Sequence, residues 1–211
     1  MSDLVVPEDT IIIYAGARDL GGNLGWASAG SFNKSVFGGS AFDMALTTRG
    51  ETGVGTTDFA PWGGSIAVDT LTSWDLSEDG SGTGQHLRST LIHEVAHVLG
   101  FGTADSWHAQ RTGNQFNGTA AVAENGGPVT LEAGSDHWLA GTMSEVWGTS
   151  TPQEANLDPD ITAIQRKEAT KLDIAALDDI GWDVNYAAIP EPTQALLLGL
   201  GSLLLLRRRR R

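Results

Sequence analysis

The strongest constraint on the fold is a segment, residues 85–99, that has the apolar spacing of an α-helix. Its apolar residues recur every four positions, at Leu87, Leu91, Val95 and Leu99. This spacing places them on one face of a helix. Gly100 follows directly and is suited to end the helix, because glycine adopts the left-handed backbone of a helix C-terminus. We therefore expect a helix over 85–99 that is packed along one face.

This helix carries the sequence His93-Glu94-Val95-Ala96-His97. Residues four apart share a helix face, so the two imidazoles can reach one ion. Glu94 lies about 100° around the helix and can act on water beside that ion. Zinc hydrolases use this pattern: two histidines bind zinc, zinc activates water, and the glutamate is the general base. The pattern predicts zinc ligands at His93 and His97 and a catalytic Glu94.

A catalytic zinc needs a third protein ligand. The chain has no cysteine and five histidines. The compact spacing of some zinc peptidases would put a histidine at position 103, which is Thr103 here. His86 lies two helical turns before His93, about 10 Å along the axis, and is too far to share the ion. Four candidates remain open: His108, His137, Glu124 and Glu132.

The order of these motifs resembles that of leishmanolysin-type metzincins. In that family an insertion separates the helix glycine from the third histidine, a methionine turn follows, and a helix ending in a segment like residues 176–182 closes the domain. The resemblance implies that His137 is the third ligand and that Met143 forms the floor of the site. It also implies that residues 63–69 are the edge strand that aligns an extended peptide. Simple packing is the alternative role for Met143.

The remaining segments indicate an α+β fold. Residues 11–14 and 65–68 are β-branched or apolar and predict strands, while 16–40 and 102–153 are predicted to be mainly loops. A second helix is expected over 171–180, with a capping box of Thr170 and Asp173 at its start and Gly181 at its end. We expect a loop-rich, metzincin-like domain over residues 10–185. Its twisted mixed sheet should pack against the active-site helix, and the C-terminal helix should close the lower lobe.

The two ends of the sequence differ from this domain. Residues 1–9 are polar and lack the features of a secretory signal peptide, so we expect a truncated start or another export route. Residues 186–194 form a linker containing Pro-Glu-Pro, and 195–211 are a short apolar run followed by five arginines. This tail resembles a PEP-CTERM sorting signal. The resemblance implies export to the bacterial envelope or beyond, transient membrane anchoring by the tail, and processing by an exosortase.

Composition limits the other functions. The net charge of −13 argues against nucleic-acid binding, and the lack of cysteine excludes disulfides and thiol nucleophiles. A calcium site is a minor prediction, with four candidate ligands: Asp58, Asp69, Asp75 and Asp79. Five tryptophans lie near the expected site and are assigned to packing rather than to a specificity pocket: Trp62, Trp74, Trp107, Trp138 and Trp147.

Three functions are compatible with these features. The favoured one is a zinc-dependent endopeptidase acting on a protein or peptide substrate. A zinc hydrolase of a non-peptide substrate is the second. The third is a catalytically silent envelope or matrix protein that retains the fold, which the intact Glu94 disfavours because a scaffold needs no general base.

Overall fold

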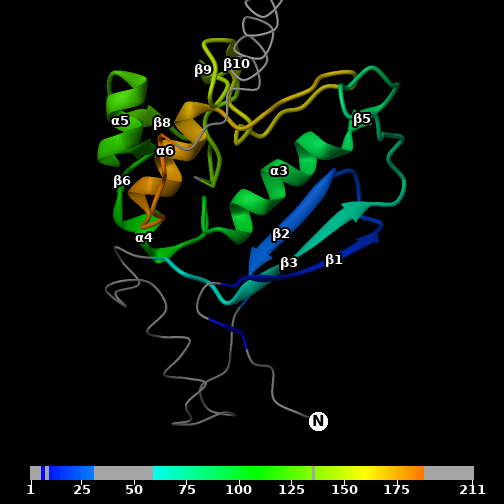
Figure 1. Ribbon diagram of the computed structural model, residues 1–211, viewed down its shortest axis with the longest axis horizontal. Coiled ribbons are helices and arrows are strands. Elements are labelled where there is room, and N and C mark those ends of the chain that lie inside the picture. Colours follow the sequence, from blue (N-terminus) through cyan, green and yellow to red (C-terminus); the bar gives the residue numbers. More distant parts are fainter. Residues whose placement is uncertain (1–5, 8–9, 31–58, 135, 188–211) are drawn as a thin grey trace, which may run out of the picture.

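The computed structural model describes residues 6–7, 10–30, 59–134 and 136–187. Over these residues the chain is α+β, with short helices and small sheets (Figure 1), which confirms the predicted class. One part contains the main sheet and helix α3. The other contains α4, α5, α6 and the short strands β6 to β10 (Figure 1).

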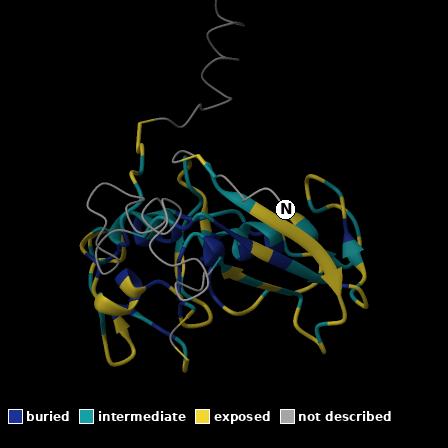
Figure 2. Cartoon of the chain, turned by 90° about the horizontal axis from the view of Figure 1, so that it is seen from below, coloured by how far each residue is buried: buried dark blue, intermediate teal, exposed yellow. Residues whose placement is uncertain are grey.

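The main sheet has three strands in the described residues. They are β1 (Ile12–Arg18), β2 (Gly25–Ala29) and β3 (Gly63–Asp69), in the order β1-β3-β2. β1 runs parallel to β3 and β2 antiparallel to it, so the sheet is mixed, as expected. β1 is largely exposed (Figure 2).

The edge-strand prediction for residues 63–69 is wrong. β3 pairs on both sides, and among the described strands β2 is the edge strand that lies next to α3. β2 falls within the stretch 16–40 that was predicted to be loop. Its residues are mostly glycine, alanine and serine, which have low β-propensity. Pairing with β3 satisfies the backbone of β2 and makes it a strand despite that composition.

Helix α3 (Leu87–Val98) starts two residues later than expected. Gln85–His86 instead forms strand β5, which pairs with β4 (Trp74–Asp75). The buried His86 ring contacts Ser89 Oγ at 2.7 Å and the Ser77 carbonyl at 3.0 Å, which holds this residue in an extended conformation. The predicted stop is confirmed, because Gly100 has a φ of 102° just after the helix.

The part of the chain beyond α3 is rich in loops, as predicted, and it also contains short helices and strands. A three-stranded antiparallel sheet has the order β6-β7-β8 and a two-stranded sheet joins β9 to β10. α5 packs on α6. The bounds are α4 (Asp105–Ala109), β6 (Arg111–Thr112), β7 (Gln115–Phe116), α5 (Thr119–Asn125), β8 (Val129–Thr130), β9 (Met143–Glu145), β10 (Pro152–Glu154) and α6 (Lys171–Asp179).

Helix α6 begins as predicted. Thr170 and Asp173 form a complete capping box, in which each side chain accepts from the other residue's backbone N–H. Gly181 follows the helix with a φ of 110°. The Trp182 indole donates to the Leu99 carbonyl at 2.7 Å. This bond joins the segment after α6 to the end of α3.

The core is centred on four fully buried aromatic rings. Phe101 and Trp107 have ring centroids 4.2 Å apart, Trp107 and Phe116 are also 4.2 Å apart, and Phe101 and Trp138 are 4.9 Å apart. These residues come from the turn after α3, from α4, from β7 and from the segment before β9. Their packing holds together chain segments that are distant in sequence.

Most of the predicted linker, residues 186–194, lies outside the described residues. The whole tail, residues 195–211, also lies outside them. Within the ranges that the structure describes, no helix has both the length and the apolar character needed to cross a bilayer.

Replacing Trp107 by alanine should lower the free energy of unfolding by about 3–5 kcal/mol, because it opens a cavity among these rings. Trp26→Ala is the matched control, since that ring is 55% exposed on β2, and it should cost about 1 kcal/mol or less. Urea unfolding followed by circular dichroism measures both. Similar losses in the two variants would contradict this assignment of the core.

Candidate metal centre

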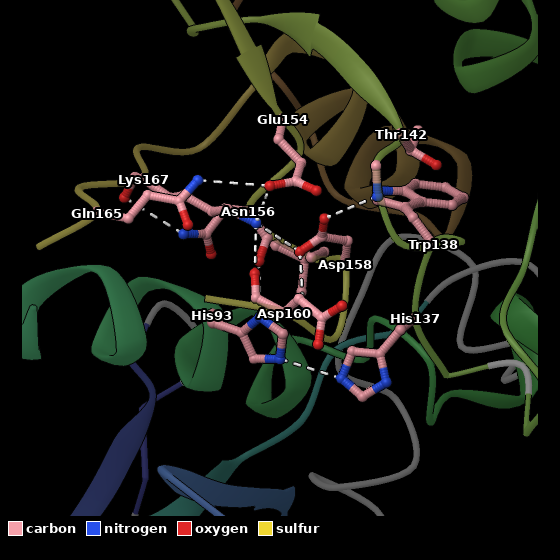
Figure 3. Close-up of polar contacts among 12 residues, drawn as sticks. His93, His137, Trp138, Thr142, Glu154, Asn156, Asp158, Asp160, Gln165 and Lys167 are labelled. Atoms are coloured by element: carbon pink, nitrogen blue, oxygen red, sulfur yellow. Dashed lines mark hydrogen bonds and ion pairs between the residues drawn. The ribbon is translucent and has the colours of Figure 1, made fainter. Parts of the chain in front are cut away.

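Three histidines meet at one point, although His137 lies 40 and 44 positions from the other two. His93 and His97 project from α3, and His137 comes from the segment between β8 and β9. The Nε2 atoms form a nearly equilateral triangle, with sides of 3.0 Å between His97 and His93 and 3.1 Å from each of these to His137. Figure 3 shows His93 and His137 facing each other across this gap.

The hydrogen bonds behind the rings determine which nitrogens carry protons. His93 Nδ1 lies 2.7 Å from the Asn156 carbonyl oxygen, and His97 Nδ1 lies 2.9 Å from the Phe101 carbonyl oxygen. A carbonyl oxygen only accepts, so both Nδ1 atoms must donate, and in the neutral rings both Nε2 atoms present bare lone pairs. Facing lone pairs 3.0 Å apart repel each other, so this arrangement favours a cation between the rings.

Burial keeps these rings uncharged. It lowers the pKa of His93 to about 3 and that of His97 to about 4, because the charged imidazolium is poorly solvated there. The pKa of His137 is lowered for the same reason. A metal ion needs the deprotonated nitrogen, so His93 and His97 are ready ligands at neutral pH.

The triangle has the dimensions of a metal site. With sides of 3.0–3.1 Å, points on either side of its plane lie about 2.1 Å from all three nitrogens, which is the zinc–imidazole distance. A metal ion held by these three rings would keep a position open for a further ligand. His93, His97 and His137 could therefore hold a metal ion. Three imidazoles suit zinc, copper, iron or nickel.

Glu94 lies beside the triad in the same cavity. Its side chain is nearly buried, at 5% exposure. Burial raises the pKa of its carboxyl to about 7, because the carboxylate loses water. Among the described residues, no hydrogen bond or ion pair holds this carboxylate. A group of this kind can exchange a proton near neutral pH.

The cavity in front of the histidines has a volume of about 760 Å³. One wall is β2 with the loop before it, and the other is the segment from Asn156 to Ile161. Three exposed or half-buried carboxylates also line it, namely Glu132, Asp136 and Asp160.

The buried carboxylate of Asp173 joins the supports of two histidines. It accepts from the Trp138 indole at 3.0 Å, from Asn156 N at 3.0 Å and from Leu157 N at 3.3 Å, besides its bonds to Thr170. Trp138 follows His137 in sequence, and Asn156 provides the carbonyl for His93. Asp173 thereby fixes the segments that hold both rings.

A buried ion group lies behind the Asn156 segment and was not predicted. Lys167 is 1% exposed, and its Nζ lies 2.7 Å from Asp158 Oδ1 and 2.9 Å from Glu154 Oε2 (Figure 3). The Asn156 amide donates to the Lys167 and Ser89 carbonyls, both at 3.3 Å. These contacts set the path of the Asn156 segment. No local sequence pattern marks them, because the partners lie 9 to 67 positions apart along the chain.

The other candidate ligands do not join the triad. The His86 ring is bonded to Ser89 and Ser77 at the start of α3, and His108 lies in an exposed position 3.1 Å from an Arg111 nitrogen. Glu132 lines the cavity, but neither it nor Glu124 belongs to the ligand group found among the described residues.

The structure corrects the position given to Met143. This residue is 58% exposed at the start of β9 and does not line the cavity. A floor residue would lie buried beneath the histidines, whereas Met143 is exposed on the β9–β10 hairpin. The Asn156–Leu157 segment contacts the site from the protein interior instead, and Leu157 is 1% exposed.

The tryptophan and calcium predictions have separate outcomes. Trp107 and Trp138 are fully buried in the core, as expected for packing.

In the described part of the chain, Asp69, Asp75 and Asp79 form no group of potential metal ligands. Asp69 and Asp75 accept bonds from neighbouring backbone amides instead. Asp58 lies outside the described residues.

Comparison with known proteins yields no relative, because no family model, no curated protein and no solved structure matches the chain.

Replacing Asp173 by asparagine should weaken both the fold and the metal site. The amide NH₂ cannot accept, so at least two buried N–H or O–H donors lose their partner, at about 1–3 kcal/mol each. Loss of such outer contacts lowers metal affinity about 10- to 100-fold. Thermal unfolding and zinc titration measure the two effects. Asp178→Asn on the same helix is the control, and unchanged zinc affinity in Asp173→Asn would contradict the role of Asp173.

Proposed function

We propose that the protein is a zinc-dependent endopeptidase with His93, His97 and His137 as zinc ligands and Glu94 as general base. The observation that carries the proposal is the convergence of three Nε2 atoms within 3.1 Å of one another, beside a buried carboxylate in an open cavity. When bound, zinc supplies a Lewis acid that polarises the scissile carbonyl and activates water.

The residues of the chain have distinct parts in this reaction. Glu94 takes a proton from the attacking water and later delivers it to the leaving amine. A carboxyl with a pKa near 7 can do both at neutral pH. The carbonyls of Asn156 and Phe101 keep the rings of His93 and His97 oriented through their Nδ1–H groups.

The edge strand supports a peptide as the substrate. β2 pairs with β3 along one edge, and residues of β2 also line the cavity. An extended peptide can add to such an edge through backbone hydrogen bonds, which requires no particular side chains. This supports an endopeptidase over a hydrolase of small non-peptide substrates.

The metal ligands and the base can be separated by mutation. Glu94→Ala should retain one zinc per chain and lose about 10²- to 10⁴-fold in kcat, because the proton acceptor is gone. His137→Ala should lose both zinc and activity. Elemental analysis and cleavage of casein or a quenched fluorescent peptide measure these outcomes.

His108→Ala is the matched control, because this histidine is exposed and outside the triad. It should keep zinc and activity. Full zinc occupancy in His137→Ala would disprove the ligand set. Zinc binding by the wild type without cleavage of any peptide would favour the silent scaffold, and cleavage of esters alone would favour the non-peptide hydrolase.

We also propose, from its resemblance to a PEP-CTERM signal, that the 195–211 tail sorts the protein to the envelope of a Gram-negative bacterium. The test is the location of the full chain and of a chain ending at residue 187, both produced behind the same export signal. The full chain should fractionate with membranes before processing and the shorter chain should not. Equal distribution of the two would contradict a sorting role.

A further inference from the structure

Glycine at position 25 is not required by the backbone. Gly25 is the first residue of β2 and pairs with Val68 of β3. Its φ lies outside the positive range, so the conformation is one that residues with side chains also adopt. Glycine in a strand weakens it, because it adds backbone freedom and no packing. The reason for a glycine at position 25 therefore lies in the space around this residue.

That space is filled by the Glu94 side chain. A Cβ placed on Gly25 would lie 2.6 Å from Glu94 Cδ and 2.7 Å from Glu94 Cγ, and closer still to Oε1. Carbon atoms pack at about 3.5–4.0 Å, so a side chain at position 25 and the observed carboxylate position exclude each other. All three nearest atoms belong to Glu94, and none to the backbone.

No polar partner among the described residues fixes the position of the Glu94 carboxylate. Glu94 is 5% exposed, yet no hydrogen bond or ion pair holds it within the described residues. Its place in the cavity is set by α3 on one side and by the bare backbone of β2 on the other. The half-buried positions of β2 are all small, at Gly25, Ala27 and Ala29, which lets the strand lie close to the helix.

We infer that Gly25 is a positioning residue for Glu94: the missing side chain leaves the room in which the carboxylate lies beside the three histidines. The inference rests on the proposed function for its effect on catalysis, but the steric coupling of the two residues stands on the geometry alone. Alanine at position 25 would displace the carboxylate while leaving the histidines in place, because the three atoms nearest to its Cβ all belong to the flexible side chain of Glu94.

The test is a double-mutant cycle of Gly25→Ala, Glu94→Ala and the two together. Gly25→Ala should bind zinc like the wild type and lose about 10²-fold in kcat, since displacement of a catalytic group by about 1 Å has that effect. KM should stay within about twofold. In the Glu94→Ala background the same change should have no further effect on kcat. Gly16→Ala is the control, because Gly16 lies in β1 of the same sheet with open space around it.

Melting temperatures of the four proteins test the coupling without activity. Gly25→Ala should lower the melting temperature when Glu94 is present and not when it is alanine. A wild-type kcat in Gly25→Ala, or equal losses of melting temperature in both backgrounds, would overturn the inference. If the wild type cleaves no peptide, the proposed function fails, and the melting temperatures still decide whether Gly25 makes room for Glu94.

Discussion

The site depends most on the hydrogen bonds that the buried carboxylate of Asp173 accepts. This carboxylate caps α6 through Thr170, holds the Trp138 indole and holds the backbone of the Asn156–Leu157 segment. Five hydrogen bonds offset the loss of water around this carboxylate, although burial still raises its pKa. One group thereby connects helix capping, the aromatic core and the supports of two histidines.

The site combines two kinds of support. The rings of His93 and His97 are oriented by hydrogen bonds to backbone carbonyls, which fix the tautomer and direct both Nε2 lone pairs to one point. Within the described part of the chain, Glu94 is held by packing alone, against the β2 backbone. A carboxylate with no fixed partner among the described residues suits the proton exchange that we propose for Glu94.

The accuracy of the sequence predictions follows from the range of the interactions involved. The α3 and α6 helices, their glycine stops and the capping box depend on neighbours within a few residues, and all were predicted. β2 was missed because its small residues have little strand preference and its pairing with β3 spans about forty positions. Met143 was assigned to the floor by likeness to a family, whereas the β9–β10 hairpin places it at the surface.

The local periodicity of a helix was enough to predict that His93 and His97 share a helix face with Glu94 beside them. The sequence left four candidates for the third ligand on residue chemistry alone. Only the tertiary structure brought His137 to within 3.1 Å of the other two rings, placed β2 at the edge of the cavity and put Gly25 against Glu94. These contacts join segments that the packing of the core brings together in space. No local sequence pattern predicts that packing.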